Sequence, residues 1–97
     1  MYARMVTVSF KLGTITEAVG IYEDSVVPVM RQQTGSKGAT LLVNKSTNTA
    51  VSTSFWETEA AMLAGEANGY LQKEMSKFAQ FFAAPPESAH YEVRTQM

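Results

Sequence analysis

Residues 39–60 read ATLLVNKSTNTAVSTSFWETEA, and this stretch decides the fold. The run Ala39–Val43 is largely apolar, and Thr49–Trp56 alternates Val, Thr and Phe with Ser, Ser and Trp, as β-strands do. Between these runs, Asn44–Asn48 consists of Asn, Lys, Ser, Thr and Asn, which are typical turn residues. The segment therefore predicts a β-hairpin in the middle of the chain.

The residues before the hairpin predict a strand followed by a helix. Tyr2–Lys11 is rich in β-forming residues that alternate between two faces, so we expect a strand that ends at Gly13. Apolar residues then recur at helical spacing over Thr14–Gln33, after a Thr-x-x-Glu capping sequence. Pro28 lies inside this helix and has no amide hydrogen to donate, so we expect a kink or a short irregular turn there. The helix is expected to stop at Gly35.

The residues after the hairpin predict a second helical region in two parts. Thr58 can cap a helix, which we expect to break at Gly65 and at the Asn-Gly pair of residues 68–69. A longer helix is then expected from Tyr70 to about Ala83, because apolar residues recur at spacings of four, three and four and two prolines follow.

A last strand, predicted over His90–Thr95, completes the order strand, helix, strand, strand, helix, strand. This order predicts an α+β, ferredoxin-like βαββαβ fold in a single domain spanning residues 1–97, with both helices on one face of a four-stranded antiparallel sheet. The other sheet face would be bare and largely uncharged. We expect a homodimer in which two such faces pack together, and the alternative is a monomer with a partly polar open face.

Composition and charge argue against several classes of function. Eight basic and nine acidic residues give a net charge of -1, so nucleic acid is not an expected partner. The chain has no cysteine, a single histidine and no phosphate-binding loop, so we expect no bound metal, haem or flavin. No apolar run approaches the roughly 20 residues of a membrane span. The N-terminus lacks a signal-peptide pattern, which makes the cytoplasm the expected location.

Several features together resemble the antibiotic-biosynthesis-monooxygenase type of dimeric α/β barrel. They are the βαββαβ order, Pro28 in the first helix, Gly35 and Gly38 ahead of the second strand, and the run Trp56-Glu57-Thr58-Glu59-Ala60 after the third. The resemblance covers nearly the whole chain. It implies a dimeric barrel and a spread of activities, namely oxygenation of aromatic polyketides or quinols without metal or flavin, haem degradation, or no known activity.

Single residues match the resembled family only in part. Trp56 corresponds to a strand-end tryptophan of the polyketide-oxidising members, whereas Ser52 stands where those members have an asparagine and Met62 roughly where they have a tyrosine. The haem-degrading members resemble one another through an asparagine on the first strand, where this chain has Val6 and Val8. They also have a tryptophan and a histidine on the second helix, which are absent here, so haem degradation is not expected.

The face of the third strand that carries Trp56, Ser52 and Ser54 is a candidate substrate-binding surface. The indole would stack on an aromatic ligand, and the serine hydroxyls would bond to ligand oxygens. The alternative is that Trp56 anchors the core or an interface and that the serines pair with their neighbours. If this face meets the helices, Val51 and Phe55 lie against the partner subunit. The apolarity of Val51 and Phe55 alone favours the opposite assignment, in which these two residues face the helices.

Three further residues are candidates for the site. His90 is a candidate catalytic base for a phenol or quinol, because histidine changes charge near neutral pH, and the alternative is an exposed or hydrogen-bonded side chain at a strand start. Arg4 is a candidate anchor for a ligand anion or carbonyl. Its alternative is a cross-strand ion pair in the neighbourhood of Arg94 and Glu92. Tyr70 is expected at the rim of a pocket mouth.

The resemblance and these residues predict a cofactor-independent monooxygenase-like protein that acts on a small aromatic, quinol or polyketide-type substrate. One alternative is a non-catalytic small-ligand-binding or stress-related protein on the same fold. Another is an assembly module whose bare sheet face is its whole purpose.

Overall fold

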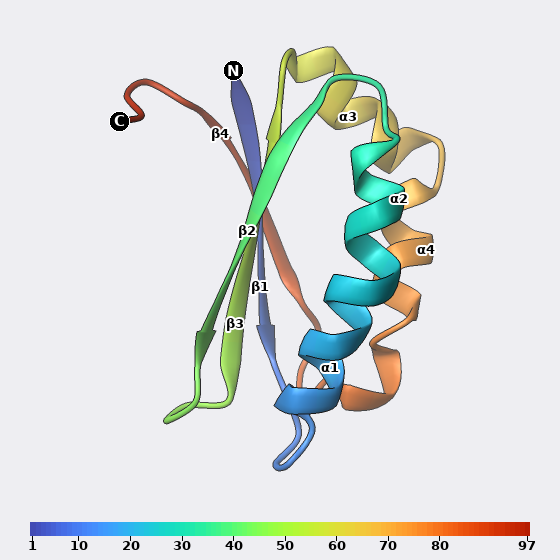
Figure 1. Cartoon of the computed structure of the whole chain (residues 1–97), viewed down its shortest axis with the longest axis vertical. Helices are drawn as coiled ribbons and strands as arrows, with labels where there is room; N and C mark the ends of the chain where they lie inside the picture. The colour runs from blue at the N-terminus through green and yellow to red at the C-terminus, as the bar shows by residue number, and fades with distance from the viewer.

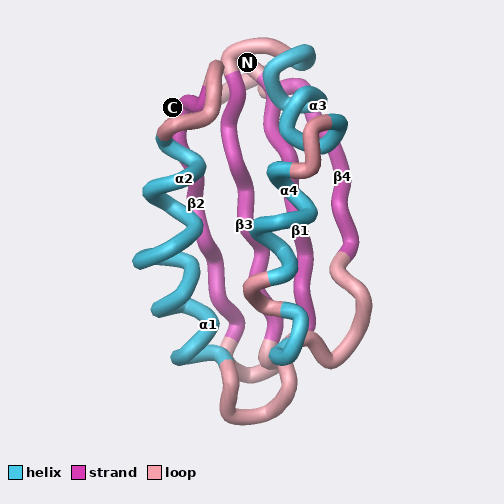
Figure 2. The backbone as a smooth tube through the Cα atoms, turned by 90° about the vertical axis from the view of Figure 1, so that its right-hand side faces the viewer, coloured by secondary structure: helices cyan, strands magenta, loops and turns pink.

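The computed structural model describes all residues 1–97 and contains one four-stranded antiparallel sheet with its helices on one face (Figures 1 and 2). In chain order the elements are β1 (Tyr2–Ser9), α1 (Ile15–Ile21), the π-helical segment η1 (Tyr22–Val26), α2 (Val27–Arg31), β2 (Ser36–Asn44), β3 (Thr49–Trp56), α3 (Glu59–Ala67), α4 (Tyr70–Ser76), the 3-10 segment η2 (Ala79–Phe81) and β4 (Glu87–Glu92). The strands lie in the order β2-β3-β1-β4. The predicted α+β, ferredoxin-like fold is confirmed. None of the helices has the length and apolar character that a membrane-spanning segment needs.

The central hairpin forms as predicted, with β3 bounded by the expected residues. The turn is held by the side-chain oxygen of Asn44, which accepts hydrogen bonds from the backbone N–H groups of Ser46 and Thr47 at 3.0 and 3.3 Å. Strand β2 begins at Ser36, three residues earlier than expected, because Ser36 still pairs with Trp56 across a bulge at Gly38.

The first helical region is one continuous rod in Figure 1, made of α1, η1 and α2. The predicted irregularity at Pro28 takes the form of the π-helical turn η1, directly before it in the chain. A proline has no N–H to offer to the carbonyl of Asp24, and the wider turn instead pairs the Val27 N–H with the carbonyl of Tyr22. The proline is thus accommodated without splitting the helix.

The second helical region begins where predicted, because the Thr58 hydroxyl accepts a hydrogen bond from the Ala61 N–H at 3.0 Å. The predicted break at Gly65 is wrong, since Gly65 lies inside α3. A side chain there would meet the ring of Tyr70, with a Cβ only 3.0 Å from Tyr70 Cδ2. The glycine therefore makes room for the tyrosine. The corner itself lies at Asn68 and Gly69, as expected, with Gly69 at φ +85°.

The last third of the chain departs from prediction in two elements, α4 and β4. Helix α4 ends at Ser76 rather than near Ala83, because the following residues turn back to bond with the end of β1: the Ala83 N–H donates to the Ser9 carbonyl at 2.7 Å. Strand β4 runs over Glu87–Glu92 rather than His90–Thr95. Its register is fixed by β1, which pairs Thr7 with Glu87 and Tyr2 with Glu92, so later residues have no β1 strand to pair with.

The two faces of the sheet have different surroundings. One face packs on the helices through a core whose buried members are Phe10, Ile15, Ala18, Tyr22, Val26, Met30, Ala50, Phe78 and Phe81. The structure places Ala50, Ser52, Ser54 and Trp56 of β3 on this helix-facing side and Val51, Thr53 and Phe55 on the other. No element of the chain covers that second face, which we call the bare face (Figure 1). Leu42 and Tyr91 lie there, 58% and 52% exposed.

Candidate functional site

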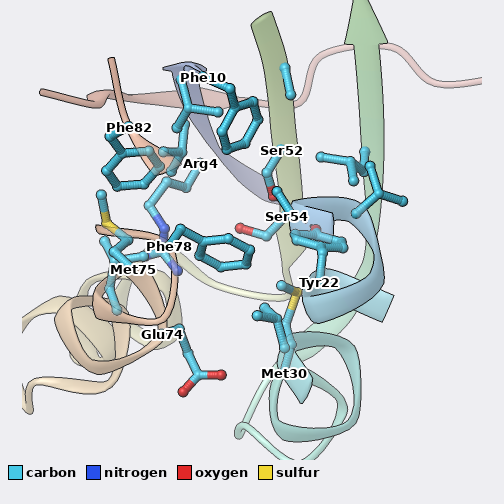
Figure 3. Close-up of a pocket in the computed structure, with 18 of the residues that line it drawn as sticks. Arg4, Phe10, Tyr22, Met30, Ser52, Ser54, Glu74, Met75, Phe78 and Phe82 are labelled. Atoms are coloured by element: carbon cyan, nitrogen blue, oxygen red, sulfur yellow. Dashed lines mark hydrogen bonds between the residues drawn. The ribbon is translucent and has the colours of Figure 1, made fainter. Parts of the chain in front are cut away.

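A cavity of about 90 Å³ lies between the sheet and the helices and is partly open to solvent. Its walls are mainly apolar side chains, including Phe10, Phe78, Phe82, Met30 and Met75 (Figure 3). An engineered apolar cavity of about 150 Å³ holds one benzene, so the enclosed space here is smaller than that and an aromatic ligand would extend through the opening. The polar side chains that line it are Arg4, Tyr22, Ser52, Ser54, Tyr70 and Glu74.

Arg4 is the most deeply buried charge at this cavity, with only 2% of its surface exposed. Its Nη1 donates to the Met62 carbonyl at 3.0 Å and to Glu66 Oε2 at 3.2 Å. Its Nε and Nη2 make no hydrogen bond to the protein, yet no buried side-chain nitrogen or oxygen of the chain lacks a partner. Each of these two nitrogens therefore retains some accessible surface, and Arg4 is one of the residues that line the cavity. The protein leaves their hydrogen-bonding capacity unused.

Trp56 contacts two residues of the cavity wall but is not among the residues that line the cavity. Its Nε1 donates to Ser54 Oγ at 2.9 Å, and its ring centroid lies 5.3 Å from Arg4 Cζ. Only 1% of Trp56 is exposed. The tryptophan thus contacts two lining residues, Arg4 and Ser54, from outside the cavity lining, and its contact with an aromatic ligand stays a prediction.

Ser52 and Tyr22 form one polar pair on the cavity wall. The Tyr22 hydroxyl and Ser52 Oγ lie 2.8 Å apart. Burial raises the pKa of the Tyr22 phenol above its ordinary value of 10.0, while the hydrogen bond to Ser52 acts in the opposite direction. Tyr22 is therefore a neutral phenol at physiological pH, with its hydroxyl already engaged.

Tyr70 and Glu74 come from α4 and also line the cavity. Burial raises the pKa of Tyr70 to about 12, with the charge of Glu74 adding to the rise and the Arg4 guanidinium opposing it. Tyr70 is thus a hydrogen-bond donor rather than a base. Glu74 is buried and pairs with Lys77 Nζ at 2.8 Å, and the same Nζ donates to Ser25 Oγ at 2.9 Å. Lys77 therefore ties α4 to η1.

His90 and Arg94 lie outside the cavity. The His90 side chain is 41% exposed, and its Nε2 lies 2.7 Å from Glu66 Oε2. Arg94 is largely exposed and pairs with Glu92 at 3.4 Å. The structure thus brings Arg4, Ser52, Ser54 and Tyr70 together at one cavity and leaves His90 on its outer side. The predicted role of His90 as a base is untested.

Sequence reasoning missed two carboxylates of this region, Glu66 and Glu74. Glu66 lies four residues after the fully buried Met62 and hence on the same helix face. A carboxylate on an apolar helix face was the signal that could have revealed it. Glu74 lies three residues before Lys77, a spacing that is typical of ion pairs on a helix surface and gives no sign of a cavity. No group of three or more His, Cys, Asp or Glu side chains comes together in a way that could hold a metal ion.

Solved structures of other proteins share this arrangement of sheet and helices. An antibiotic biosynthesis monooxygenase-like protein of Nitrosomonas europaea superposes with a TM-score of 0.78 at 18% identity, covering 98% of this chain and 100% of that one. A similar protein of Deinococcus radiodurans gives 0.79 at 14% identity, over 100% and 96% of the two chains. This chain has the antibiotic biosynthesis monooxygenase fold. The resemblance seen in the sequence is confirmed at this level.

One solved structure with the antibiotic biosynthesis monooxygenase fold holds a ligand. It is a monooxygenase from the gene ActVA-Orf6 of Streptomyces coelicolor in complex with nanaomycin D, with a TM-score of 0.76 and 20% identity over 99% of this chain and 89% of that one. Identities this low show the shared fold alone.

Two curated proteins are related to the chain in sequence, and their names state no activity. The proteins Rv2557 and MT2634 of Mycobacterium tuberculosis are each 27% identical over 93 residues, which is 96% of this chain. The chain spans about two fifths of their length, 41%. No family model matches the sequence.

Proposed function

We propose that the chain binds a small aromatic molecule with a hydroxyl or keto oxygen in the cavity between sheet and helices, and that it oxygenates this molecule with dioxygen alone. The observation that carries the proposal is the buried Arg4 at the wall of an otherwise apolar cavity. Apolar walls favour a flat ring, and a cation with unused donors favours an electron-rich oxygen on that ring. The ligand complex of a monooxygenase with the same fold supports the choice of aromatic substrate.

The proposed chemistry needs no metal or flavin. A phenol or quinol loses its proton to water, and the resulting anion passes one electron to dioxygen. The two radicals combine at a ring carbon, and the resulting peroxide takes back the proton as a hydroperoxide. This hydroperoxide loses water together with the hydrogen of that carbon. One oxygen atom of dioxygen thus stays on the ring carbon as a keto group, and the other leaves as water with the hydrogens of that carbon and of the hydroxyl.

Arg4 would assist this step by stabilising the substrate anion, as a positive charge near an ionising hydroxyl does. Tyr70 holds its proton and would donate a hydrogen bond to a second ligand oxygen. Ser54 offers a further hydroxyl beside Arg4. These three residues are the substrate-binding set that we propose, with Trp56 behind them.

One observation favours a second candidate, a non-catalytic ligand-binding protein. His90 lies outside the cavity, and the carboxylate of Glu74 is engaged by Lys77, so the chain places no free base beside the ligand. Oxygen uptake separates the two candidates. A panel of anthrones and quinols is supplied to the wild-type chain and to Arg4→Met, with Arg94→Met as the matched control for loss of an exposed arginine.

The monooxygenase proposal expects uptake of one dioxygen per keto product in the wild type and in Arg94→Met, and a loss of about 10²-fold or more in Arg4→Met. Tight binding of the same compounds without oxygen uptake would support the non-catalytic candidate instead.

We also propose that two copies of the chain pack through the bare face. Leu42, Phe55 and Tyr91 on this face give it a large apolar content that a monomer would leave in water. A two-fold contact between identical faces would cover it in both copies.

A further inference from the structure

Glu66 connects a buried residue of the cavity with an exposed residue outside it. One carboxylate oxygen, Oε2, lies 3.2 Å from Arg4 Nη1 and 2.7 Å from His90 Nε2. Arg4 and His90 are direct partners in the pairing of β1 with β4, so both point to the side of the sheet where α3 carries Glu66. We propose that Glu66 is a positioning residue that couples protonation of His90 to the strength with which Arg4 binds an anionic ligand oxygen. This inference rests on the ligand site proposed above.

The coupling arises because one carboxylate oxygen of Glu66 contacts both Arg4 and His90. When His90 is neutral, its Nε2–H donates to Glu66, and the negative charge of Glu66 offsets that of Arg4. When His90 is protonated, the imidazolium adds a second positive charge at the same oxygen, 2.7 Å away. The cluster then changes from net zero to net positive, and a ligand anion at the free guanidinium nitrogens of Arg4 is held more tightly. Because Arg4 is buried among apolar side chains, water screens this change less than it would at the surface.

The other charged groups nearby do not reproduce this effect. On β4, Glu92 lies two residues from His90 and pairs with Arg94, and its partner across the ladder is Tyr2 of β1. On α4, Glu74 pairs with Lys77. Tyr22 and Tyr70 have raised pKa values and keep their protons at neutral and acidic pH. Histidine is the side chain that changes charge between about pH 5 and 8, and His90 is the only one in the chain.

The test measures the affinity of two probes of equal size at about pH 5.5 and about pH 8, the interval in which histidine titrates. Benzenesulfonate is an anion throughout this interval, and benzenesulfonamide is neutral, so neither probe contributes a titration of its own. Each carries a single ring, the smallest aromatic unit to offer to a cavity of about 90 Å³ that is partly open to solvent. Binding to the isotope-labelled wild-type chain is followed by NMR chemical-shift titration, and the same titrations are made with His90→Gln, Glu66→Gln and, as a matched control for a carboxylate on β4, Glu92→Gln.

The inference predicts that wild type and Glu92→Gln bind benzenesulfonate about fivefold more tightly at the lower pH, at the weak end of couplings between two sites. His90→Gln loses this difference, because the titrating group is gone. Glu66→Gln binds the sulfonate more tightly than the wild type at the higher pH, because no carboxylate offsets the charge of Arg4 there. The sulfonamide shows no pH dependence in any variant. A purely structural role of Glu66 would weaken both probes equally and leave the pH profile unchanged.

The results that would overturn the inference are distinguishable. Equal affinity of the wild type for benzenesulfonate at both pH values, a pH difference that persists in His90→Gln, or no gain in affinity of Glu66→Gln at the higher pH would contradict the coupling while leaving the ligand site intact. If neither probe shifts any resonance of the cavity residues, the ligand site itself is wrong and the coupling falls with it.

Discussion

The guanidinium carbon of Arg4 lies 5.3 Å from the centroid of the Trp56 ring, so a buried cation rests over an indole that is itself buried. The negative face of the ring attracts the cation, and the indole N–H holds the neighbouring Ser54. Trp56 therefore fixes two residues of the cavity wall without lining the cavity. Its function in this account is to place Arg4.

Replacement of Trp56 tests this placement. Trp56→Ala is expected to lower the free energy of unfolding by about 3–5 kcal/mol, the usual cost of deleting a large buried aromatic side chain. Trp56→Phe keeps most of the packing and loses the hydrogen bond to Ser54. We expect it to fold and to bind an aromatic ligand more weakly, with a smaller loss than Arg4→Met shows. Chemical denaturation and calorimetry measure the two effects, and unchanged affinity in Trp56→Phe would contradict the supporting role.

The contact between Gly65 and the Tyr70 ring predicts opposite effects of the same substitution at two helical glycines. Gly65→Ala places a methyl group 3.0 Å from Tyr70 Cδ2. Although alanine favours the helix, we expect this close contact to lower the free energy of unfolding by about 1 kcal/mol in total. Gly20→Ala meets nothing within 4 Å in α1 and should stabilise the chain by about 0.5–1 kcal/mol. Urea unfolding of both variants gives the comparison. Equal stabilisation by both would show that the ring is not held against Gly65.

The raised pKa of Tyr70 predicts a loss of stability in alkali. In the unfolded chain tyrosine ionises near 10.0, whereas in the folded chain the pKa of Tyr70 is about 12. The folded state therefore holds this proton more strongly, and the contribution is fully present below pH 10.0 and is lost as pH rises through about 12. Tyr70→Phe should have a shallower fall in unfolding free energy over this interval. Parallel curves for the two proteins would exclude burial of the phenol.

The bare face predicts a concentration-dependent dimer that one substitution can break. Leu42→Glu buries a charge between two copies and should shift the sedimenting species from about twice 10.6 kDa to 10.6 kDa. Leu12→Glu changes an equally apolar and more exposed residue away from the sheet and should leave the dimer intact. A wild-type chain that sediments as a monomer at micromolar concentration would contradict the proposal.

The fold could be predicted where local chemistry decides it. Thr58 caps α3, Asn44 closes the hairpin, and the proline in the first helix produces an irregular turn, each through contacts within a few residues. The position of β4 could not be predicted in this way, because its alternating residues fit several registers. Pairing with β1, whose residues lie 80 to 90 positions earlier in the chain, selects the register.

The candidate site was predictable in part for the same reason. The alternation in β3 placed Ser52 and Ser54 on one face, and the structure shows that this face meets the helices. The environment of Arg4 depends on Met62 and Glu66, which lie 58 and 62 residues away in sequence. No spacing rule connects residues across such distances. The helix pattern could place Glu66 on the buried side of its helix, but neither its pairing with Arg4 nor the position of His90 outside the cavity could be foreseen.

The most direct test of the central claim, that Arg4 binds the oxygen of an aromatic ligand in this cavity, is an anaerobic calorimetric titration with 1,4-naphthohydroquinone. Nitrogen prevents oxidation, so only binding is measured. The account predicts saturable binding to wild type and to Arg94→Met, and a loss of about 10- to 100-fold in affinity for Arg4→Met, the scale of a hydrogen bond to a charged group. Equal affinity of wild type and a folded Arg4→Met would contradict it.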